Sequence, residues 1–198
     1  MIKALVLDFD GVIRDMDMER TEQMMRRIGL SPDEFFSRVF TEEHINDLIT
    51  GKISIEEWWS YLREKYPEFK EVDSNFIWDE VFAYSVINDD VLEIVREVGD
   101  KMQTAILTNA AKEWLPTIME QIEGTSFDHI FTSGYLGVAK PHPEVYKKVL
   151  KELDVLPEEC LFLDDKLRNV DGAKELGINA HIFQSEEQIR SLLKNYCN

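Results

Sequence analysis

The chain has 198 residues, 44% hydrophobic and 31% charged, a composition typical of a globular protein with one core and room for a small second domain. Its 39 acidic and 22 basic residues give a formal net charge of −17, which argues against binding nucleic acid or an anionic membrane through bulk charge. No apolar run approaches the roughly 20 residues that span a bilayer, and the N-terminus lacks a signal segment. The two cysteines form neither a zinc motif nor a disulfide framework. We therefore expect a cytoplasmic protein without nucleic-acid or membrane partners.

The first strand is predicted over residues 2–7, where branched apolar side chains run into Asp8-Phe9-Asp10-Gly11. Open α/β sheets build their sites at the carboxyl ends of such strands. Asp8 and Asp10 are two residues apart, so on a regular strand both carboxylates would point the same way and would need a cation or a shared proton. This pattern predicts a metal-assisted site with a carboxylate nucleophile. The alternative is a strand that simply ends in an acidic turn.

Residues 17–86 have helical periodicity and no clear strand pattern, which predicts a helical insertion. Ser54-Ile55-Glu56-Glu57 has the form of a capping box and opens a helix to about residue 66. Other helices are expected to begin near residues 18, 32 and 41, and a fifth to cover about 73–85. Three tryptophans of this segment, Trp58, Trp59 and Trp78, are expected to form its core rather than to stack on a ligand.

The rest of the chain alternates between short apolar runs and amphipathic segments, which predicts an α/β fold. Strands are expected over residues 102–107, 129–132, 161–163 and 180–183. Helices are expected over residues 91–98, 112–121, 143–153, 169–176 and 185–194. Strands separated by helices of this length indicate a parallel sheet with helices on both faces.

Polar side chains follow four successive strands of this predicted sheet. They are Asp8 and Asp10, Thr108 and Asn109, Lys140, and Asp164 and Asp165. Because the carboxyl ends of parallel strands lie along the same edge of the sheet, we expect these side chains to converge on one cleft. Each pair alone is weak evidence, but four sets at four successive strand ends predict a site.

The chemistry of these side chains is mutually consistent. Four carboxylates from two loops suit an oxygen-preferring divalent cation, Mg²⁺ above all. The hydroxyl of Thr108, the amide of Asn109 and the ammonium of Lys140 fit the oxygens of a transferring phosphoryl group. Asp8, at the strand terminus, is the better candidate for a nucleophile that forms an aspartyl phosphate. Asp10 would then protonate the leaving oxygen and later activate water.

These residues resemble, in order and spacing, the four motifs of the haloacid dehalogenase superfamily. The motifs are Asp8-Phe9-Asp10-Gly11-Val12, Leu107-Thr108-Asn109, Lys140-Pro141 and Leu163-Asp164-Asp165. The resemblance covers a Rossmann-like core of residues 1–15 and 87–198, and residues 169–177 look like the helix that follows the fourth motif. Residues 16–86 look like the family's helical cap of the first type.

The resemblance implies a Mg²⁺-dependent phosphohydrolase whose cap closes over the core. It implies that Asp8 is nucleophile and metal ligand, and that Asp10 is the acid/base and binds the metal through its backbone carbonyl. Asp165 would be the second metal ligand, and Asp164 would ligate the metal or orient water. Thr108, Asn109 and Lys140 would hold the phosphoryl group.

The substrate class is also implied by the resemblance. Haloacid dehalogenases lack an acid at the place of Asp10, so its presence argues for phosphoryl transfer. The motif variants look most like the branch of sugar-phosphate phosphatases and the phosphatase half of epoxide hydrolases. The expected partner is therefore a small phosphorylated metabolite, with a sugar phosphate ahead of a nucleoside monophosphate, and the expected state is a monomer.

Several alternatives stay open at this point. A phosphomutase acting on a hexose phosphate uses the same aspartyl phosphate, and a non-catalytic regulatory module could share the fold. Arg14 and Asp15, just after the first motif, either contact the leaving group of a substrate or pair with each other. His142 is expected to lie in solvent in the first turn of a helix.

Overall fold

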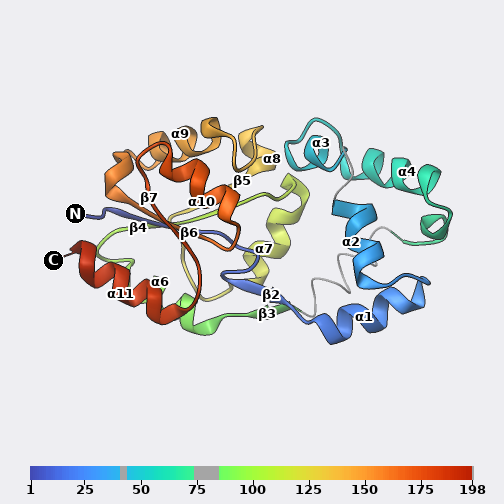
Figure 1. Cartoon of the computed structure of the whole chain (residues 1–198), viewed down its shortest axis with the longest axis horizontal. Helices are drawn as coiled ribbons and strands as arrows, with labels where there is room; N and C mark the ends of the chain where they lie inside the picture. The colour runs from blue at the N-terminus through green and yellow to red at the C-terminus, as the bar shows by residue number, and fades with distance from the viewer. Residues whose placement is uncertain (41–43, 74–84, 198) are drawn as a thin grey trace.

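The structure is a computed structural model that describes the chain except for residues 41–43, 74–84 and 198. It consists of an α/β layered part and a helical unit that lie end to end, with both chain termini at the end far from the helical unit (Figure 1). The predicted fifth helix and Trp78 lie outside the described residues. No described helix is long and apolar enough to cross a membrane.

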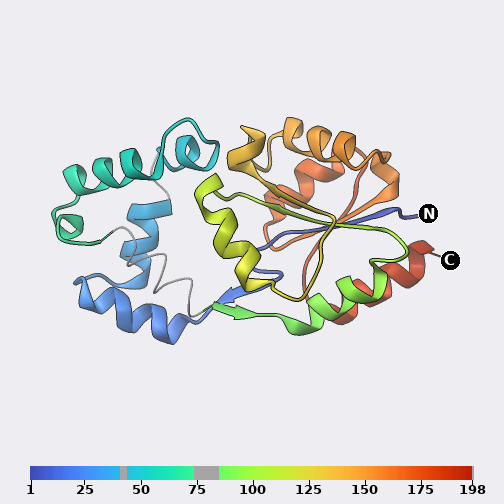
Figure 2. The same cartoon turned by 180° about the vertical axis from the view of Figure 1, so that it is seen from behind.

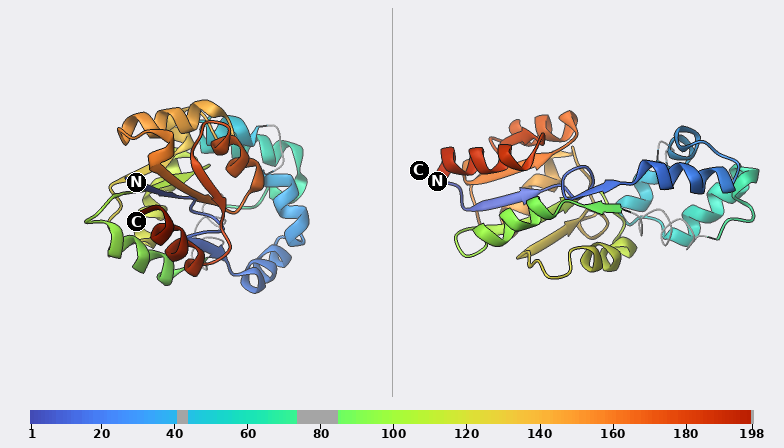
Figure 3. Two further views of the ribbon diagram at one scale, coloured as in Figure 1. Left: turned by 60° about the vertical axis from the view of Figure 1, so that its left-hand side comes forward. Right: turned by 90° about the horizontal axis from the view of Figure 1, so that it is seen from below.

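A five-stranded parallel sheet forms the centre of the α/β part, in the order β5-β4-β1-β6-β7. The strands are β1 (Ala4–Leu7), β4 (Gln103–Thr108), β5 (His129–Thr132), β6 (Cys160–Asp164) and β7 (Asn179–Ile182). All four residues of β1 are buried, because β4 and β6 flank it and helices cover both faces. The carboxyl ends of the strands point toward the helical unit, which the view from behind and the view from below show as well (Figures 2 and 3).

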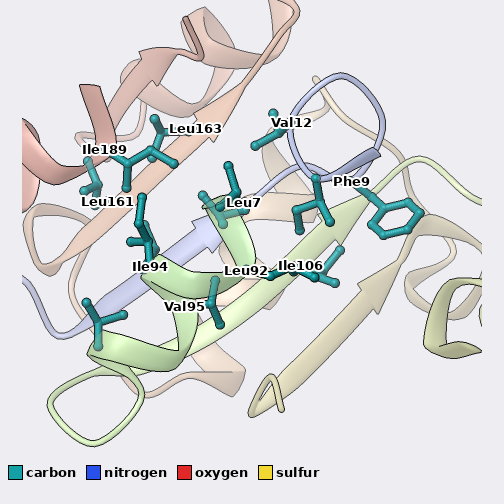
Figure 4. Close-up of a cluster of buried hydrophobic side chains, with 14 of the residues drawn as sticks. Leu7, Phe9, Val12, Leu92, Ile94, Val95, Ile106, Leu161, Leu163 and Ile189 are labelled. Carbon is teal, nitrogen blue, oxygen red and sulfur yellow. The ribbon is translucent and has the colours of Figure 1, made fainter. Parts of the chain in front are cut away.

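Helices cover the two faces of the sheet, as the alternation of side chains along β1 requires. Leu5 and Leu7 pack in one buried cluster with side chains of α6 (Asp89–Val98), α7 (Leu115–Gln121) and α11 (Glu186–Cys197), part of which Figure 4 shows. Ala4 and Val6 face the opposite cluster, which includes side chains of α9 (Pro143–Glu152) and α10 (Leu167–Lys174). The predicted α/β class with a doubly covered parallel sheet is therefore confirmed.

The helical unit has a hydrophobic core of its own. Its elements are α1 (Met18–Arg27), α2 (Pro32–Phe40), α3 (Ile45–Ile49), α4 (Ile55–Lys65) and the 3₁₀ turn η1 (Pro67–Phe69). Trp58 and Trp59 are fully buried in this core and pack edge to face, so the expectation that they are core residues is confirmed. The predicted capping box is present at the start of α4, where Ser54 and Glu57 exchange bonds with each other's backbone N–H.

Two short antiparallel strands connect the helical unit to the sheet. β2 (Arg14–Met16) pairs with β3 (Ser85–Ile87). The sequence predicts a helix to about residue 85 and no strand within residues 17–86, and both expectations are wrong at this end, because β3 begins at Ser85. Three-residue strands are too short to show a period of two, and only the pairing of the outgoing with the returning chain defines them.

The remaining elements are short. The predicted helix over 112–121 begins as the 3₁₀ turn η3 (Lys112–Trp114) and continues as α7. The one-turn helix α8 (Ser133–Leu136) follows β5, and no pattern in the sequence predicted it. The 3₁₀ turn η4 (Pro157–Glu159) precedes β6.

The helical unit contacts the core through α3 and α8. The buried hydroxyl of Ser133 donates to the carbonyl oxygen of Ile49 at 2.6 Å. Gly51, at φ +72°, approaches Gly134 so closely that a Cβ at residue 51 would lie 2.7 Å from the Gly134 carbonyl oxygen. The two parts therefore touch beside the carboxyl edge of the sheet, where the loops after β4 and β5 lie.

Candidate active site

Three carboxylates meet at the carboxyl ends of β1 and β6. Asp8 directly follows β1, and Asp164 ends β6 with Asp165 behind it. Each offers an oxygen, and these oxygens lie within 4.8 Å of one another. Asp8 is 6% exposed and Asp164 is fully buried, so the negative charges are largely removed from water. Because such burial is costly unless the charges are compensated, these carboxylates need positively charged partners or protons.

Lys140 supplies one compensating charge from inside the protein. Its Nζ lies 2.8 Å from Asp8 Oδ1 and 2.7 Å from Asp164 Oδ2, and it also donates to the Leu107 carbonyl oxygen at 2.7 Å. All three ammonium hydrogens are thereby used, and the side chain is almost fully buried. The predicted convergence of Lys140 with Asp8 and Asp164 is present in the structure.

The side chain of Asn109 fixes the backbone of Lys140. Its amide nitrogen donates to the Lys140 carbonyl oxygen, and its amide oxygen accepts from the Lys140 N–H, both at 2.8 Å. Asn109 therefore joins the loop after β4 to the loop that carries Lys140, a task that its position in the sequence did not indicate. Thr108, buried at the end of β4, lies next to it.

The electrostatics of this cluster follow from burial. Burial raises the pKa of Asp8, the positive charge of Lys140 acts against this rise, and Asp164 adds to it, so that the pKa lies well above its usual range. Burial by itself would lower the pKa of Lys140, but Asp8 and Asp164 outweigh it and raise that pKa. Lys140 therefore stays protonated, and full ionisation of Asp8 near neutral pH would be favoured by a second cation.

Asp164 and Asp165 differ in what their oxygens already bind. Asp164 accepts from Lys140, from the backbone N–H of Lys166 and, on both oxygens, from the Asn169 amide at 2.9 and 3.0 Å. Asp165 Oδ2 pairs with the Lys166 ammonium, whereas its buried Oδ1 has no hydrogen-bond partner among the described residues. Asp165 therefore has an oxygen left for a cation, whereas both oxygens of Asp164 already accept hydrogen bonds.

The residues present fit a divalent cation. The donors are carboxylate oxygens, which a hard ion such as Mg²⁺ prefers, and one of them is buried without a hydrogen-bond partner in the described part of the chain. Asn169, which orients Asp164, is itself held by its backbone, since the Tyr146 hydroxyl donates to its carbonyl oxygen at 2.7 Å. Sequence reasoning missed this supporting role; the only signal was an amide in the first turns of the helix after the acidic pair.

Gly11 leaves room for Asp165, and this gives a first prediction. Gly11 has φ +84°, and a Cβ there would lie 2.5 Å from Asp165 Cγ. We expect Gly11→Ala to displace the Asp165 carboxylate and to weaken Mg²⁺ binding about tenfold or more, since Asp165 Oδ1 is the oxygen left for a cation and its position would change. Isothermal titration of Mg²⁺ into the protein measures this.

The matched control is Gly29→Ala in the helical unit. Gly29 has a similar φ of +76°, but a Cβ there would meet nothing within 4 Å. It carries the backbone strain of a left-handed residue without the clash. Equal Mg²⁺ affinities of the two variants would contradict the role assigned to Gly11.

Asp10 does not join the buried carboxylates. The chain turns sharply after Asp8, because the N–H groups of Ile13 and Arg14 both donate to the Phe9 carbonyl oxygen. The side chain of Asp10 is 56% exposed and pairs with Arg14. The expectation that both carboxylates point the same way is therefore wrong, since it assumed a regular strand through residue 10, whereas β1 ends at residue 7.

For Arg14, the structure decides one of the two predicted alternatives. This residue is 6% exposed and its ion-pair partner is Asp10, while Asp15 is exposed, so the pairing of Arg14 with Asp15 is not formed. His142 is exposed as expected and caps α9, where its Nδ1 accepts from the Glu144 N–H at 3.2 Å.

Comparison with known proteins identifies a matching family model and relatives that are similar in sequence. A family model described as haloacid dehalogenase-like hydrolase matches residues 2–177. D-ribitol-5-phosphate phosphatase from Bacteroides thetaiotaomicron is 28% identical over 195 residues, covering 94% of this chain and 93% of that protein. Drimenol cyclase drtB from Aspergillus calidoustus is 23% identical over 199 residues, which cover 98% of this chain but 36% of that longer protein.

A solved structure is similar over nearly the whole chain. It is the magnesium complex of the HAD family enzyme bt-2542 from Bacteroides thetaiotaomicron. The TM-score is 0.78 at 25% sequence identity, and the match covers 97% of this chain and 98% of that one. The similarity therefore extends over both the α/β part and the helical unit.

Proposed function

Because the chain belongs to the haloacid dehalogenase-like hydrolase family, as its motifs predicted, we propose that it is a magnesium-dependent phosphatase of small phosphorylated metabolites. Sugar phosphates are the favoured class, which the similarity to a phosphatase named for D-ribitol 5-phosphate supports. In this proposal residues 1–15 and 87–198 form the catalytic core and residues 16–86 form a cap. The observation that carries it is the cluster of Asp8, Asp164 and Asp165, in which the buried Asp8 and Asp164 both pair with Lys140.

Asp8 is the nucleophile in this proposal. Its carboxylate oxygen attacks the phosphorus, and the bond from phosphorus to the leaving oxygen breaks, which gives an aspartyl phosphate. Lys140, whose ammonium lies 2.8 Å from Asp8 Oδ1, holds this carboxylate in place and offsets the charge of the phosphoryl oxygens. Thr108 ends β4, the strand beside β1, and Asn109 follows it, so both residues lie at the same edge of the sheet as Asp8.

Asp10 handles the proton. It donates a proton to the leaving oxygen, so that a neutral alcohol departs, and it then accepts a proton from the water that attacks the aspartyl phosphate. The products are inorganic phosphate and the restored Asp8 carboxylate. The exposure of Asp10 suits this task, because a carboxylate that is 56% exposed can exchange protons with water.

Asp8, Asp165 and the backbone carbonyl of Asp10 would hold Mg²⁺, while Asp164 orients the site. The bound ion would supply the charge that favours ionised Asp8 and would stabilise the negative charge that develops on the phosphoryl group. The magnesium complex of bt-2542 supports the choice of metal.

A substrate panel tests this function. The purified chain is assayed for release of inorganic phosphate from sugar phosphates, polyol phosphates, nucleoside monophosphates and p-nitrophenyl phosphate, with MgCl₂ and with EDTA. We expect phosphate release that requires Mg²⁺ and that is fastest with a sugar or polyol phosphate. Conversion of a hexose phosphate into its isomer without free phosphate would instead identify a phosphomutase. Mg²⁺ binding without turnover of any substrate would indicate a non-catalytic module and would refute the proposal.

A further inference from the structure

A buried arginine holds the carboxylate to which the proposed reaction assigns the proton. Arg14 donates to Asp10 Oδ1 through Nε at 2.8 Å and through Nη2 at 2.5 Å. Its Nη1 donates to Gln121 Oε1 of α7 at 2.9 Å. The guanidinium carbon also lies 4.7 Å from the centre of the Phe9 ring.

These contacts fix Arg14 more firmly than an ordinary surface ion pair. The arginine side chain is 6% exposed and its partner carboxylate 56% exposed, so the buried member determines where the exposed member lies. The planar guanidinium has a rigid set of donors, and Gln121 and Phe9 hold it from two further sides. Asp10 itself stands on a tight turn, in which Gly11 N–H donates to the Arg14 carbonyl oxygen at 2.8 Å.

The two oxygens of Asp10 are therefore not equivalent. Both bonds from Arg14 end on Oδ1, which leaves Oδ2 as the oxygen that can exchange a proton with the substrate or with water. Rotation of the carboxylate would break two charge-assisted hydrogen bonds, which are the stronger kind.

We propose that Arg14 is the positioning residue of Asp10, which holds Oδ1 so that Oδ2 faces the leaving oxygen and later the attacking water. This inference rests on the proposed phosphatase function. Arg14 is also the first residue of β2 and lies opposite Ile87 of β3. These two strands carry the chain between the core and the helical unit. The residue that orients Asp10 thus stands at this connection.

A double-mutant cycle tests the inference. Arg14→Ala, Asp10→Asn and the combined variant are assayed with an alkyl phosphate and with p-nitrophenyl phosphate, whose good leaving group needs little protonation. We expect Arg14→Ala to lower kcat for the alkyl phosphate about 10- to 100-fold, with KM changed less than about threefold. The loss should be smaller for the aryl phosphate. In the Asp10→Asn background the same substitution should cost less than about twofold.

Companion variants separate positioning from folding. Arg14→Lys, which keeps the charge but not the two-pronged geometry, should recover only part of kcat. Gln121→Ala, which keeps the pair but removes an anchor, should lose less than Arg14→Ala. Asp15→Asn, on the same strand and exposed, should behave as wild type. Urea unfolding verifies that each variant is folded.

One outcome would refute the positioning role of Arg14, and another would refute the phosphatase function itself. If Arg14→Ala costs the same factor with and without Asp10, or costs the same with both substrates, Arg14 acts on the fold and the positioning role is refuted. If the wild-type chain releases no phosphate from any substrate, the proposed function fails and the role of Arg14 fails with it.

Discussion

Asp8→Asn is expected to lower phosphate release by a factor on the order of 10³ or more, the largest effect of any single substitution. An amide is a poor nucleophile, so no aspartyl phosphate forms. The change also removes a charged partner of Lys140 and one of three clustered carboxylates. Because asparagine has nearly the same shape as aspartate, the fold should persist and the loss should lie in chemistry.

The measurement is phosphate release at saturating Mg²⁺ and substrate, together with acid-quench trapping of labelled phosphate on the protein. Wild type should carry trapped label and Asp8→Asn none. Asp15→Asn, exposed on β2, serves as the carboxylate control and should retain wild-type activity. An Asp8→Asn variant with more than about a tenth of wild-type activity would mean that another group attacks the phosphorus.

Lys140→Met is expected to destabilise the metal-free protein by about 3–5 kcal/mol, because it leaves Asp8 and Asp164 buried without their shared cation. Methionine fills most of the space of the lysine stem, so the loss reflects charge rather than a cavity. Activity should fall as well, since the same ammonium holds the nucleophile. Urea unfolding at neutral pH with EDTA measures the change in the free energy of unfolding.

The destabilisation should depend on pH and on Mg²⁺. Burial raises the pKa of Asp8 above its unfolded value, so protonation favours the folded state. Loss of the Lys140 ammonium raises the folded pKa of Asp8 further, so the deficit of Lys140→Met is largest above the folded pKa of the variant and shrinks as the pH falls from there toward the folded pKa of the wild type. Added Mg²⁺ should restore part of the stability, because it binds only the folded cluster.

The control for this substitution is Lys147→Met on α9. Among the residues that the structure describes, Lys147 pairs with Glu144 alone, at 55% and 51% side-chain exposure. Such pairs contribute little, so its loss should change the free energy of unfolding by no more than about 0.5 kcal/mol. Equal effects of the two substitutions would show that the buried position of Lys140 does not matter.

Much of the site followed from local pattern. Two buried strands, one followed directly by Asp8 and one leading into Asp164-Asp165, are visible in the sequence as apolar runs followed by acids. Topology then does the rest, because parallel strands joined by helices bring all their carboxyl ends to one edge. Lys140 could be placed there on the same argument. The capping box at Ser54 was equally readable, because its two bonds join residues three apart.

Other features required contacts between distant parts of the chain. The pairing of β2 with β3 joins residues about seventy positions apart, and neither strand is long enough to show a period. The bonds of Asn109 to the Lys140 backbone also join distant residues, 31 positions apart in the chain. Such side chain–backbone bonds leave no pattern in the sequence, since any loop of suitable length could receive them.

The sequence alone thus determined the sheet, the order of its strands' polar ends and the class of chemistry, because these depend on periodicity and on the general topology of parallel sheets. Only the tertiary structure decided the direction of Asp10, which turns out of the cluster toward Arg14. That direction depends on a tight turn at residues 9–14 and on Gln121, more than a hundred residues away, whose contact with Arg14 exists only once the chain has folded.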